Sequence, residues 1–258
     1  MNEKCINLNA DLGESFGAYS IGDDEAMLDI VSTANVGCGF HGGDHLVMRR
    51  TVQLAAEKGV SIGAHPSFPD RQGFGRRRMD LDHEEIEALI LYQTGALMAV
   101  AKAAGTEVTH VKPHGALNTM AAKDIRLSLA IAQAMKALDP HLILLAPATS
   151  AMVEAGDQMG LRVAGEIFAD RTYGEDGHLT PRSEPNAFIH DAAESVRQIM
   201  TFLKAGGIVT PSGKVLPASL HSVCVHGDGP KAVTFAGQVR KRLVEDGWQV
   251  PPLPAALA

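Results

Sequence analysis

Short apolar segments alternate with longer amphipathic segments along almost the whole chain, and this alternation most constrains the fold. The short segments are apolar on both faces, as buried parallel strands are. Parallel strands need crossover connections, which the longer segments can supply as helices. The expected strands are 5–10, 32–37, 60–64, 108–112, 142–146, 162–168 and 222–225. The expected helices are 24–31, 45–58, 82–104, 124–138, 150–159, 185–205 and 231–245.

About seven such strand–helix units predict an α/β fold, and our first choice is a distorted (β/α) TIM-like barrel. Barrels of this type commonly have about 250 residues in one domain. A doubly wound open sheet is the alternative, because the pattern alone does not determine closure. No linker divides the chain, so we expect one barrel domain over 1–258. It would carry a hairpin insertion at 207–219 and a C-terminal tail at 248–258 that crosses the surface.

Composition narrows the choice of partners and compartment. The net charge of −7 leaves no basic surplus to neutralise phosphates, so no nucleic-acid partner is expected. The one basic run, 76–78, is interpreted as a solvated or structural turn. No apolar run reaches the roughly 18 residues of a membrane span, and the first residues do not resemble a secretory signal. Three cysteines without a CxxC pair favour a reducing, cytoplasmic location.

Polar and ionisable side chains follow six of the seven expected strands, where each strand ends. In a parallel barrel these ends meet at one rim, where active sites are built. A single histidine or aspartate there is usually a loop or cap residue, and Asp44 and Asp228 are plausible helix caps. However, five of the 11 histidines lie at these rims, which favours a shared site. The candidates are Asn9, Asp11, Glu14, His41, Asp44, His65, Lys112, His114, Glu166, Asp170, Arg171 and His226.

Several familiar motifs are matched only weakly. Residues 37–42 fit GxGxxG, but they do not follow the first strand, and no acidic residue ends the next one. Residues 213–214 resemble the end of a phosphate-binding loop but lack its leading glycine, so a hairpin turn is expected. Asp11, His41 and His65 are a ligand set suited to zinc or another divalent ion, yet their spacing is not local, and a catalytic metal is not expected. Cys38 is more plausible as a buried structural residue than as a nucleophile.

Seven segments together resemble the LamB/YcsF family, and they occur in order from Asn7 to the last expected helix. They are NLNADLGE at 7–14, CGFHGGD at 38–44, GAHPS at 63–67, GFGRR at 73–77, VKPHGAL at 111–117, FADR at 168–171 and HGD at 226–228. The resemblance implies a barrel similar to the glycoside hydrolase/deacetylase group. One departure is Asn118-Thr119, where the family usually has Tyr-Asn, and a different residue there would alter substrate affinity if that tyrosine touches substrate.

The resemblance also implies a reaction. It is that of one component of an ATP-dependent 5-oxoprolinase, which converts 5-oxo-L-proline, ATP and water into L-glutamate, ADP and phosphate. The implied cofactor is ATP, with Mg²⁺ accompanying it, and the implied partners are subunits B and C. Because the chain has no recognisable nucleotide loop, its ATP chemistry is expected to depend on those partners.

For such a reaction, the rim residues have hypothetical roles. Asp11, Glu14 or His65 would activate water, Lys112 would stabilise developing negative charge, and His114 or Glu166 would protonate the leaving nitrogen. The substrate-binding candidates are Asn9, His41, Asp44, Asp170, Arg171 and His226. Two other functions remain open: a metal-dependent deacetylase or amidohydrolase acting on a carbohydrate or amide, and a non-catalytic subunit that carries substrate to its partners.

Overall fold

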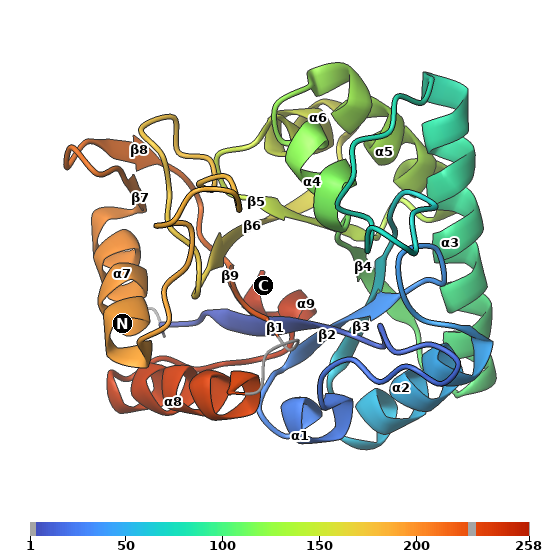
Figure 1. Cartoon of the computed structure of the whole chain (residues 1–258), viewed down its shortest axis with the longest axis horizontal. Helices are drawn as coiled ribbons and strands as arrows, with labels where there is room; N and C mark the ends of the chain where they lie inside the picture. Colours follow the sequence, from blue (N-terminus) through green and yellow to red (C-terminus); the bar gives the residue numbers. More distant parts are fainter. Residues whose placement is uncertain (1–3, 227–230, 258) are drawn as a thin grey trace.

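A closed barrel of seven parallel strands forms the centre of the computed structural model, which describes residues 4–226 and 231–257 (Figure 1). The strands are β1 (Asn7–Leu12), β2 (Thr33–Gly37), β3 (Ser61–His65), β4 (Val108–Val111), β5 (Ile143–Pro147), β6 (Arg162–Phe168) and β9 (Ser222–Val225). The last strand closes the ring because Ser222 is in register with Asn7 of β1 and with Glu166 of β6. The predicted TIM-like barrel is confirmed, and the open-sheet alternative is wrong.

Helices surround the barrel and cover its apolar outer face. They are α1 (Asp24–Leu28), α2 (His45–Glu57), α3 (His83–Ala103), α4 (Gly115–Ala121), α5 (Ile125–Leu138), α6 (Ala151–Met159), α7 (Ala192–Ala205) and α8 (Ala232–Glu245). By length and composition α3 alone among the described helices could cross a membrane, but it packs between α2 and α5 and buries one side in the core, as a helix of a soluble barrel does. Its first turn is held by a capping box between Asp82 and Glu85.

Two helices differ from the sequence-based expectation. The expected helix at 185–205 begins only at Ala192, where Asp191 caps it, and the preceding residues form a loop. That loop is held because the guanidinium of Arg171 donates hydrogen bonds to the carbonyls of Thr180 and Ala187. Helix α4 was not expected at all. It is short, and it starts at Gly115 with a φ of 59°, a left-handed conformation that gives no helical sequence signal.

Residues 207–217 form the expected antiparallel hairpin, with strands β7 (Gly207–Val209) and β8 (Val215–Pro217). The C-terminal tail differs from expectation, because it enters the barrel instead of crossing the surface. Its short helix α9 (Leu253–Ala256) lies behind the centre of the ring in Figure 1. Leu253 is fully buried against β5 and β6, and its backbone N–H donates to the Thr33 hydroxyl of β2. The apolar side chains of the tail thus plug an end that the strands leave open.

The barrel interior is polar above this plug. The Asn9 amide donates to Ser222 at 2.7 Å and to Glu166 at 3.0 Å, and its oxygen accepts from Asn35 at 2.8 Å. The ring of His110 continues the network to Asn35 at 2.9 Å, and burial lowers the pKa of this histidine to about 3. This hydrogen-bonded layer links β1, β2, β4, β6 and β9, and it leaves only Glu166 Oε2 among these buried atoms without a partner.

Candidate functional site

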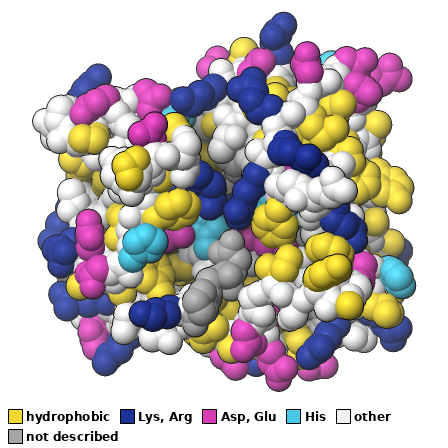
Figure 2. All heavy atoms as spheres, in the orientation of Figure 1, with side chains coloured by type: hydrophobic (Ala, Val, Ile, Leu, Met, Phe, Trp, Pro, Cys, Tyr) yellow, Lys and Arg dark blue, Asp and Glu magenta, His cyan; other side chains and the backbone are white. Residues whose placement is uncertain are grey.

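A cavity of about 460 Å³ opens at the rim formed by the carboxyl ends of the strands. Its lining combines acids, histidines and cations with the rings of Phe74 and Phe168. Figure 2 shows Lys and Arg side chains gathered around the hollow at the centre of this face. The ionisable residues that line the cavity are Asp11, Glu14, His65, Arg76, Arg78, Lys112, His114, Lys123, Arg171, Arg182 and His226.

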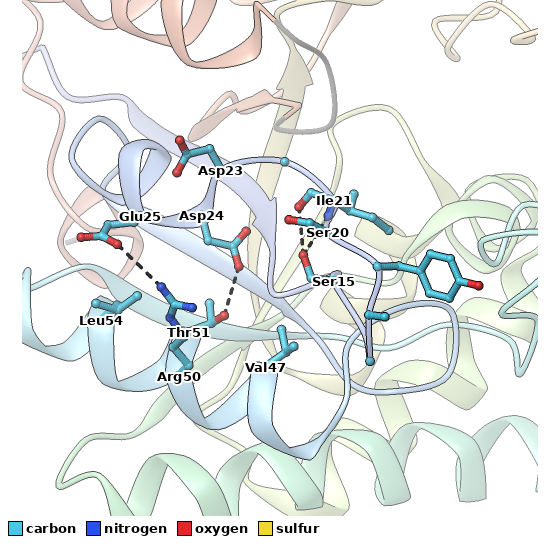
Figure 3. Close-up of a pocket in the computed structure, with 14 residues that line it drawn as sticks. Ser15, Ser20, Ile21, Asp23, Asp24, Glu25, Val47, Arg50, Thr51 and Leu54 are labelled. Carbon is cyan, nitrogen blue, oxygen red and sulfur yellow. Dashed lines mark hydrogen bonds and ion pairs between the residues drawn. The ribbon is translucent and has the colours of Figure 1, made fainter.

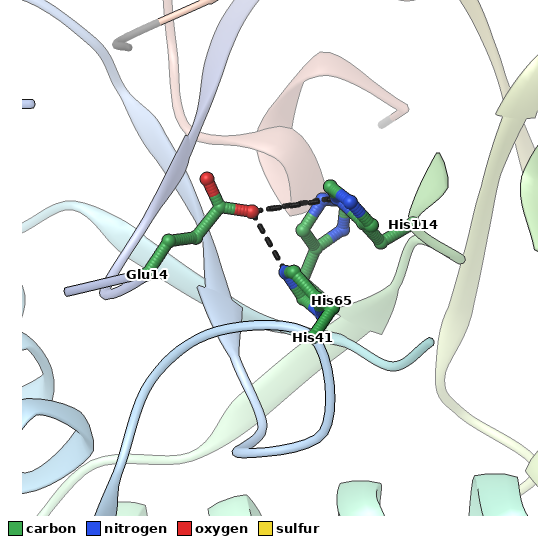
Figure 4. A group of neighbouring side chains, drawn as sticks. All are labelled: Glu14, His41, His65 and His114. Atoms are coloured by element: carbon green, nitrogen blue, oxygen red, sulfur yellow. Dashed lines mark hydrogen bonds and ion pairs between the residues drawn. The ribbon is translucent and has the colours of Figure 1, made fainter. Parts of the chain in front are cut away.

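Four buried side chains converge at one side of this cavity, and we call them the histidine cluster: Glu14, His41, His65 and His114 (Figure 4). Glu14 follows β1, His41 follows β2, His65 ends β3 and His114 follows β4. The Glu14 Oε1 atom lies 2.8 Å from His41 Nε2 and 3.4 Å from His114 Nδ1. The rings of His41 and His114 stack with centroids 3.7 Å apart. Four neighbouring strands therefore deliver one compact group.

Burial shapes the charge state of these rings. It holds the pKa of His41 and of His114 well below the usual value, and the neighbouring imidazoles act in the same direction. Both rings are therefore neutral at physiological pH, and a neutral imidazole has one nitrogen with a free lone pair. Neutral imidazole is the form that acts as a base or as a metal ligand.

Lys112 lies beside the cluster, at the end of β4 and between two carboxylates. Its Nζ atom is 2.9 Å from Asp11 Oδ1 and 2.9 Å from Glu166 Oε1. Burial alone would lower the pKa of Lys112, but Asp11, Cys224 and Glu166 raise it well above the usual value. The pKa of Asp11 is held low against burial by His65 and Lys112, whereas burial raises the pKa of Glu166. The site thus contains the Lys112 cation, the ionised carboxylate of Asp11, and the carboxyl group of Glu166, whose raised pKa means that it holds a proton more tightly.

His226 lines the cavity near Asp11 and forms a second pair with Asp170 behind it. His226 Nδ1 lies 2.7 and 2.8 Å from the two oxygens of Asp170. Burial opposes the charged ring, but Asp170 raises the pKa of His226 above the usual value. Burial and the nearby Arg182 lower the pKa of Arg171 to about 10, so this side of the cavity contains crowded cations. An anion bound there would relieve their repulsion.

The structure places the remaining candidates differently. Asn9 and Glu166 lie inside the barrel beneath Lys112 rather than in the cavity lining. Asp44 lies outside the group altogether, because its carboxylate accepts from Leu46 and Val47 as the cap of α2. Asn118, at the position where the family usually has tyrosine, lines the cavity and donates to the Pro113 carbonyl at 2.9 Å. Asp228 lies outside the described residues.

Some cavity residues were not expected from the sequence. Arg76 and Arg78 of the basic run face the cavity, and only Arg77 has the structural role expected of a turn, pairing with Asp70. Arg182 belongs to the loop that was expected to lead into a helix. The available signal was the arginine run at 76–78, which overlaps the GFGRR segment at 73–77. Composition alone did not indicate that these arginines lie at the rim.

Neither Cys38 nor the glycine-rich loop at 37–43 forms a reactive or phosphate-binding site. Burial raises the pKa of Cys38 to about 12, which makes this thiol inert. The glycines at 42 and 43 let the 37–43 loop pack against the backbone of Gly13 and Glu14, where a Cβ at Gly42 would lie 2.8 Å from the Glu14 carbonyl. This loop therefore positions Glu14 and His41 and does not present its amides to a phosphate.

A separate pocket of about 540 Å³ lies between α1 and α2 (Figure 3). Asp24 accepts hydrogen bonds from Thr51 at 3.1 Å and from the Gly13 backbone at 3.0 Å. Arg50 pairs loosely with Glu25 on the exposed rim. These groups satisfy one another, so we assign this pocket a structural role.

Comparison with known proteins shows the family to which the chain belongs. Residues 6–258 match the sequence profile of the LamB/YcsF family. The chain is 52% identical over 249 residues to the A subunit of 5-oxoprolinase from Azoarcus sp. strain BH72, an alignment that covers 96% of this chain and 97% of that protein. The lactam utilization protein from Thermus thermophilus superposes with a TM-score of 0.89 at 42% identity, covering 96% of this chain and 99% of that one.

A more distant likeness concerns the fold alone. The catalytic domain of peptidoglycan N-acetylglucosamine deacetylase from Eubacterium rectale superposes with a TM-score of 0.53 at 12% identity, over 99% of this chain and 90% of that one. The expected similarity of the barrel to the deacetylase fold is thereby confirmed.

Proposed function

The chain belongs to the LamB/YcsF family, and from that premise we propose that it is the A subunit of an ATP-dependent 5-oxoprolinase. The enzyme is a hydrolase of a cyclic amide: it opens 5-oxo-L-proline to L-glutamate while ATP becomes ADP and phosphate. Its partners in the cytoplasm are subunits B and C. The supporting relatives are named for this activity and are similar over nearly the full chain.

The observation that carries this proposal is the combination of cations and catalytic groups in one cavity. 5-Oxoproline is a small anion with a carboxylate beside its lactam ring. Arg182 is suited to that carboxylate, because arginine binds carboxylates with a planar fork of donors. Arg171, whose Nε and Nη2 atoms donate to backbone carbonyls, adds positive charge beside it. The lactam would then point toward Lys112 and the histidine cluster, on the opposite side of the cavity.

The chemistry required is the opening of an amide, whose C–N bond has partial double-bond character and resists water. Phosphorylation of the carbonyl oxygen by ATP releases ADP and makes the carbonyl carbon a better electrophile. Water adds to that carbon and the C–N bond breaks, and a second water then releases phosphate from the resulting acyl phosphate. We assign Lys112 to stabilising the negative charge of the phosphorylated group. Asp11, Glu14 or His65 activates water, and His114 or Glu166 protonates the departing nitrogen. His226 and Asp170 position the substrate carboxylate.

ATP with its Mg²⁺ is a substrate of the complex, and we assign its binding to the partner subunits. Supporting this, the glycine-rich loop of the described chain packs against its own backbone. The cationic Arg76 and Arg78 at the cavity mouth would receive the phosphorylated intermediate.

The test is glutamate formation from 5-oxoproline and ATP, measured with the chain alone and with subunits B and C added. We expect turnover only in the full mixture. Arg182→Met should raise KM for 5-oxoproline at least tenfold, whereas the exposed Arg126→Met should not change it. Robust turnover by the chain alone would refute the dependence on partners, and no turnover in the full mixture would refute the function.

A second candidate is a metal-dependent deacetylase or amidohydrolase, favoured by the histidine cluster and by the fold. Turnover of an acetylated sugar or simple amide without ATP would support it over the first. A third is a subunit that only carries substrate. Substituting His65 by alanine separates the last two cases, since a carrier would lose affinity while a catalyst would keep binding and lose rate.

A further inference from the structure

The donor atoms of the histidine cluster surround one point. His65 Nε2 lies 3.0 Å from His114 Nδ1 and 4.0 Å from Glu14 Oε1, and all four donors lie within 4.8 Å of one another. A tetrahedral zinc site with bonds of about 2.0–2.1 Å has donors about 3.3–3.4 Å apart. The observed separations of 2.8 to 4.0 Å bracket that value.

Hydrogen bonds at the far side of two rings decide which nitrogens face this point without a proton. His65 Nδ1 lies 2.7 Å from the Lys112 carbonyl, and His114 Nε2 lies 2.8 Å from the Phe74 carbonyl. A carbonyl oxygen only accepts, so these nitrogens carry the protons. The lone pairs of His65 Nε2 and His114 Nδ1 therefore face each other at 3.0 Å, an arrangement that requires either a shared proton or a metal ion between them.

We propose that the histidine cluster binds one divalent transition-metal ion through Glu14 Oε1, His65 Nε2 and His114 Nδ1, while His41 stacks on His114 and contacts Glu14 as an outer partner. Two imidazoles and one carboxylate with an open fourth position suit Zn²⁺ best, because zinc prefers nitrogen ligands with tetrahedral geometry. The carbonyls that hold His65 and His114 are the outer partners that metal-bound histidines usually have. The site goes beyond the proposed function: with an ion bound, Glu14, His65 and His114 are its ligands, and of the alternatives assigned above Asp11 is then the residue that activates water and Glu166 the one that donates the proton.

The surroundings are built for such a site. Gly75 has a φ of 64°, and a Cβ there would lie 2.8 Å from the His41 side chain and 2.9 Å from His114. This glycine lets its loop close over the two rings and bury them. Glu14, His65 and His114 also line the cavity, so an ion held by them is within reach of whatever the cavity binds.

The proposed ligands differ from the set considered on sequence alone, which combined Asp11 with His41 and His65. Asp11 instead forms an ion pair with Lys112, and it lies in a second group with Cys224 and His226. That second group is less suited to a metal, because burial raises the pKa of the Cys224 thiol well above its usual value. It provides a control for the location of any bound ion.

The experiment titrates Zn²⁺ into the full-length chain after removal of metals with a chelator, using calorimetry and elemental analysis. We expect one equivalent of bound zinc. Glu14→Gln and His65→Asn should each weaken binding by about 100-fold or more, beyond the usual effect of losing an outer-shell partner. Cys224→Ser and His226→Asn should each retain one equivalent with unchanged affinity. Circular dichroism confirms that each variant is folded.

Cobalt provides an independent measurement. Co²⁺ bound by the parent chain should give the visible absorption of a low-symmetry nitrogen-ligated site, and Glu14→Gln, which preserves shape, should lose or shift it. Absence of stoichiometric zinc, equal affinity in a folded Glu14→Gln or His65→Asn variant, or loss of zinc in the Cys224 or His226 variants would overturn the proposal. Because the readout is bound metal and not glutamate, this result is independent of the oxoprolinase assay.

Discussion

Lys112 is a fully buried cation whose charge is matched by Asp11 and Glu166 at 2.9 Å each. Removing one partner of a buried ion pair leaves the others uncompensated, which typically costs about 3–5 kcal/mol. Lys112→Met should therefore lower the free energy of unfolding by about that amount, measured by urea denaturation. The surface residue Lys136, which only donates to a helix-end carbonyl, is the matched control, and Lys136→Met should stay within about 0.5 kcal/mol. Equal stability of the two variants would contradict the assigned role of Lys112.

The His226–Asp170 pair predicts a pH dependence. The pKa of His226 is raised in the folded state, so its contribution to stability is present below its unfolded pKa of about 6.5 and is lost as pH rises through the folded value. The pKa of Asp170 is lowered despite burial, chiefly by His226, so its contribution is lost only as pH falls through that low folded value. The pair is therefore strongest from weakly acidic to near-neutral pH.

Asp170→Asn should lower the pKa of His226, because it removes the main carboxylate that favours the charged ring, while Asp11 is more distant and Arg182 repels. An NMR titration of the His226 ring measures this directly. The loss of stability that we expect for the parent as pH rises above about 6.5 should also disappear in the variant. An unchanged pKa of His226 would show that Asp170 does not hold its proton.

Among elements, the C-terminal helix α9 has a larger role than its length suggests. Its buried Leu253 fills the end of the barrel between β5 and β6, and α9 also contacts β1. Leu253→Ala would leave a cavity inside the ring, and such truncations cost about 2–5 kcal/mol. Guanidinium denaturation should show this loss, and the exposed Leu46→Ala, in the first turn of α2, should show less than about 1 kcal/mol. A loss below 1 kcal/mol for Leu253→Ala would mean that the tail is not part of the core.

The loops and helices around the barrel also determine which residues line the cavity. The loops after β3 and β6 bring Arg76 and Arg182 over the strand ends, while helix α4 and the loop before it hold His114 and Asn118 at the cavity wall. Substrate choice therefore depends on residues from loops, and the histidine cluster and Lys112 depend on the strands. This division explains how the tyrosine-to-asparagine departure at Asn118 can alter substrate binding without disturbing the cluster.

At the scale of the whole molecule, charge is distributed unevenly. The chain has a net charge of −7, yet arginines and lysines gather around the cavity mouth (Figure 2). An acidic protein with a cationic cavity attracts small anions selectively, because the low-dielectric walls focus the local field. The same mouth is the surface at which a partner subunit would deliver a phosphorylated substrate, which is why the partner-dependent assay tests the molecule as a whole.

The sequence by itself determined the order of strands and helices and most of the polar residues at the ends of the strands. Strand positions were predictable because buried parallel strands are short apolar runs, and the residues that follow a strand must lie at the rim whatever the closure. The family and its lactam-opening reaction also followed from segments such as 7–14 and 111–117, and both are confirmed. The individual roles of the site residues stay predictions.

Only the tertiary structure decided which rim residues meet. Glu14 and His114 are separated by 100 positions in the chain, and their contact depends on strand order and register. Burial, which lowers the pKa of His114, and the carbonyl that orients its ring exist only after folding. The same holds for Asp44, which from the sequence was either a substrate-binding residue or a helix cap. It holds also for the C-terminal tail, whose apolar residues are buried only because the strands leave one end of the barrel open. Local pattern specifies elements, but distances between side chains arise from packing over the whole chain.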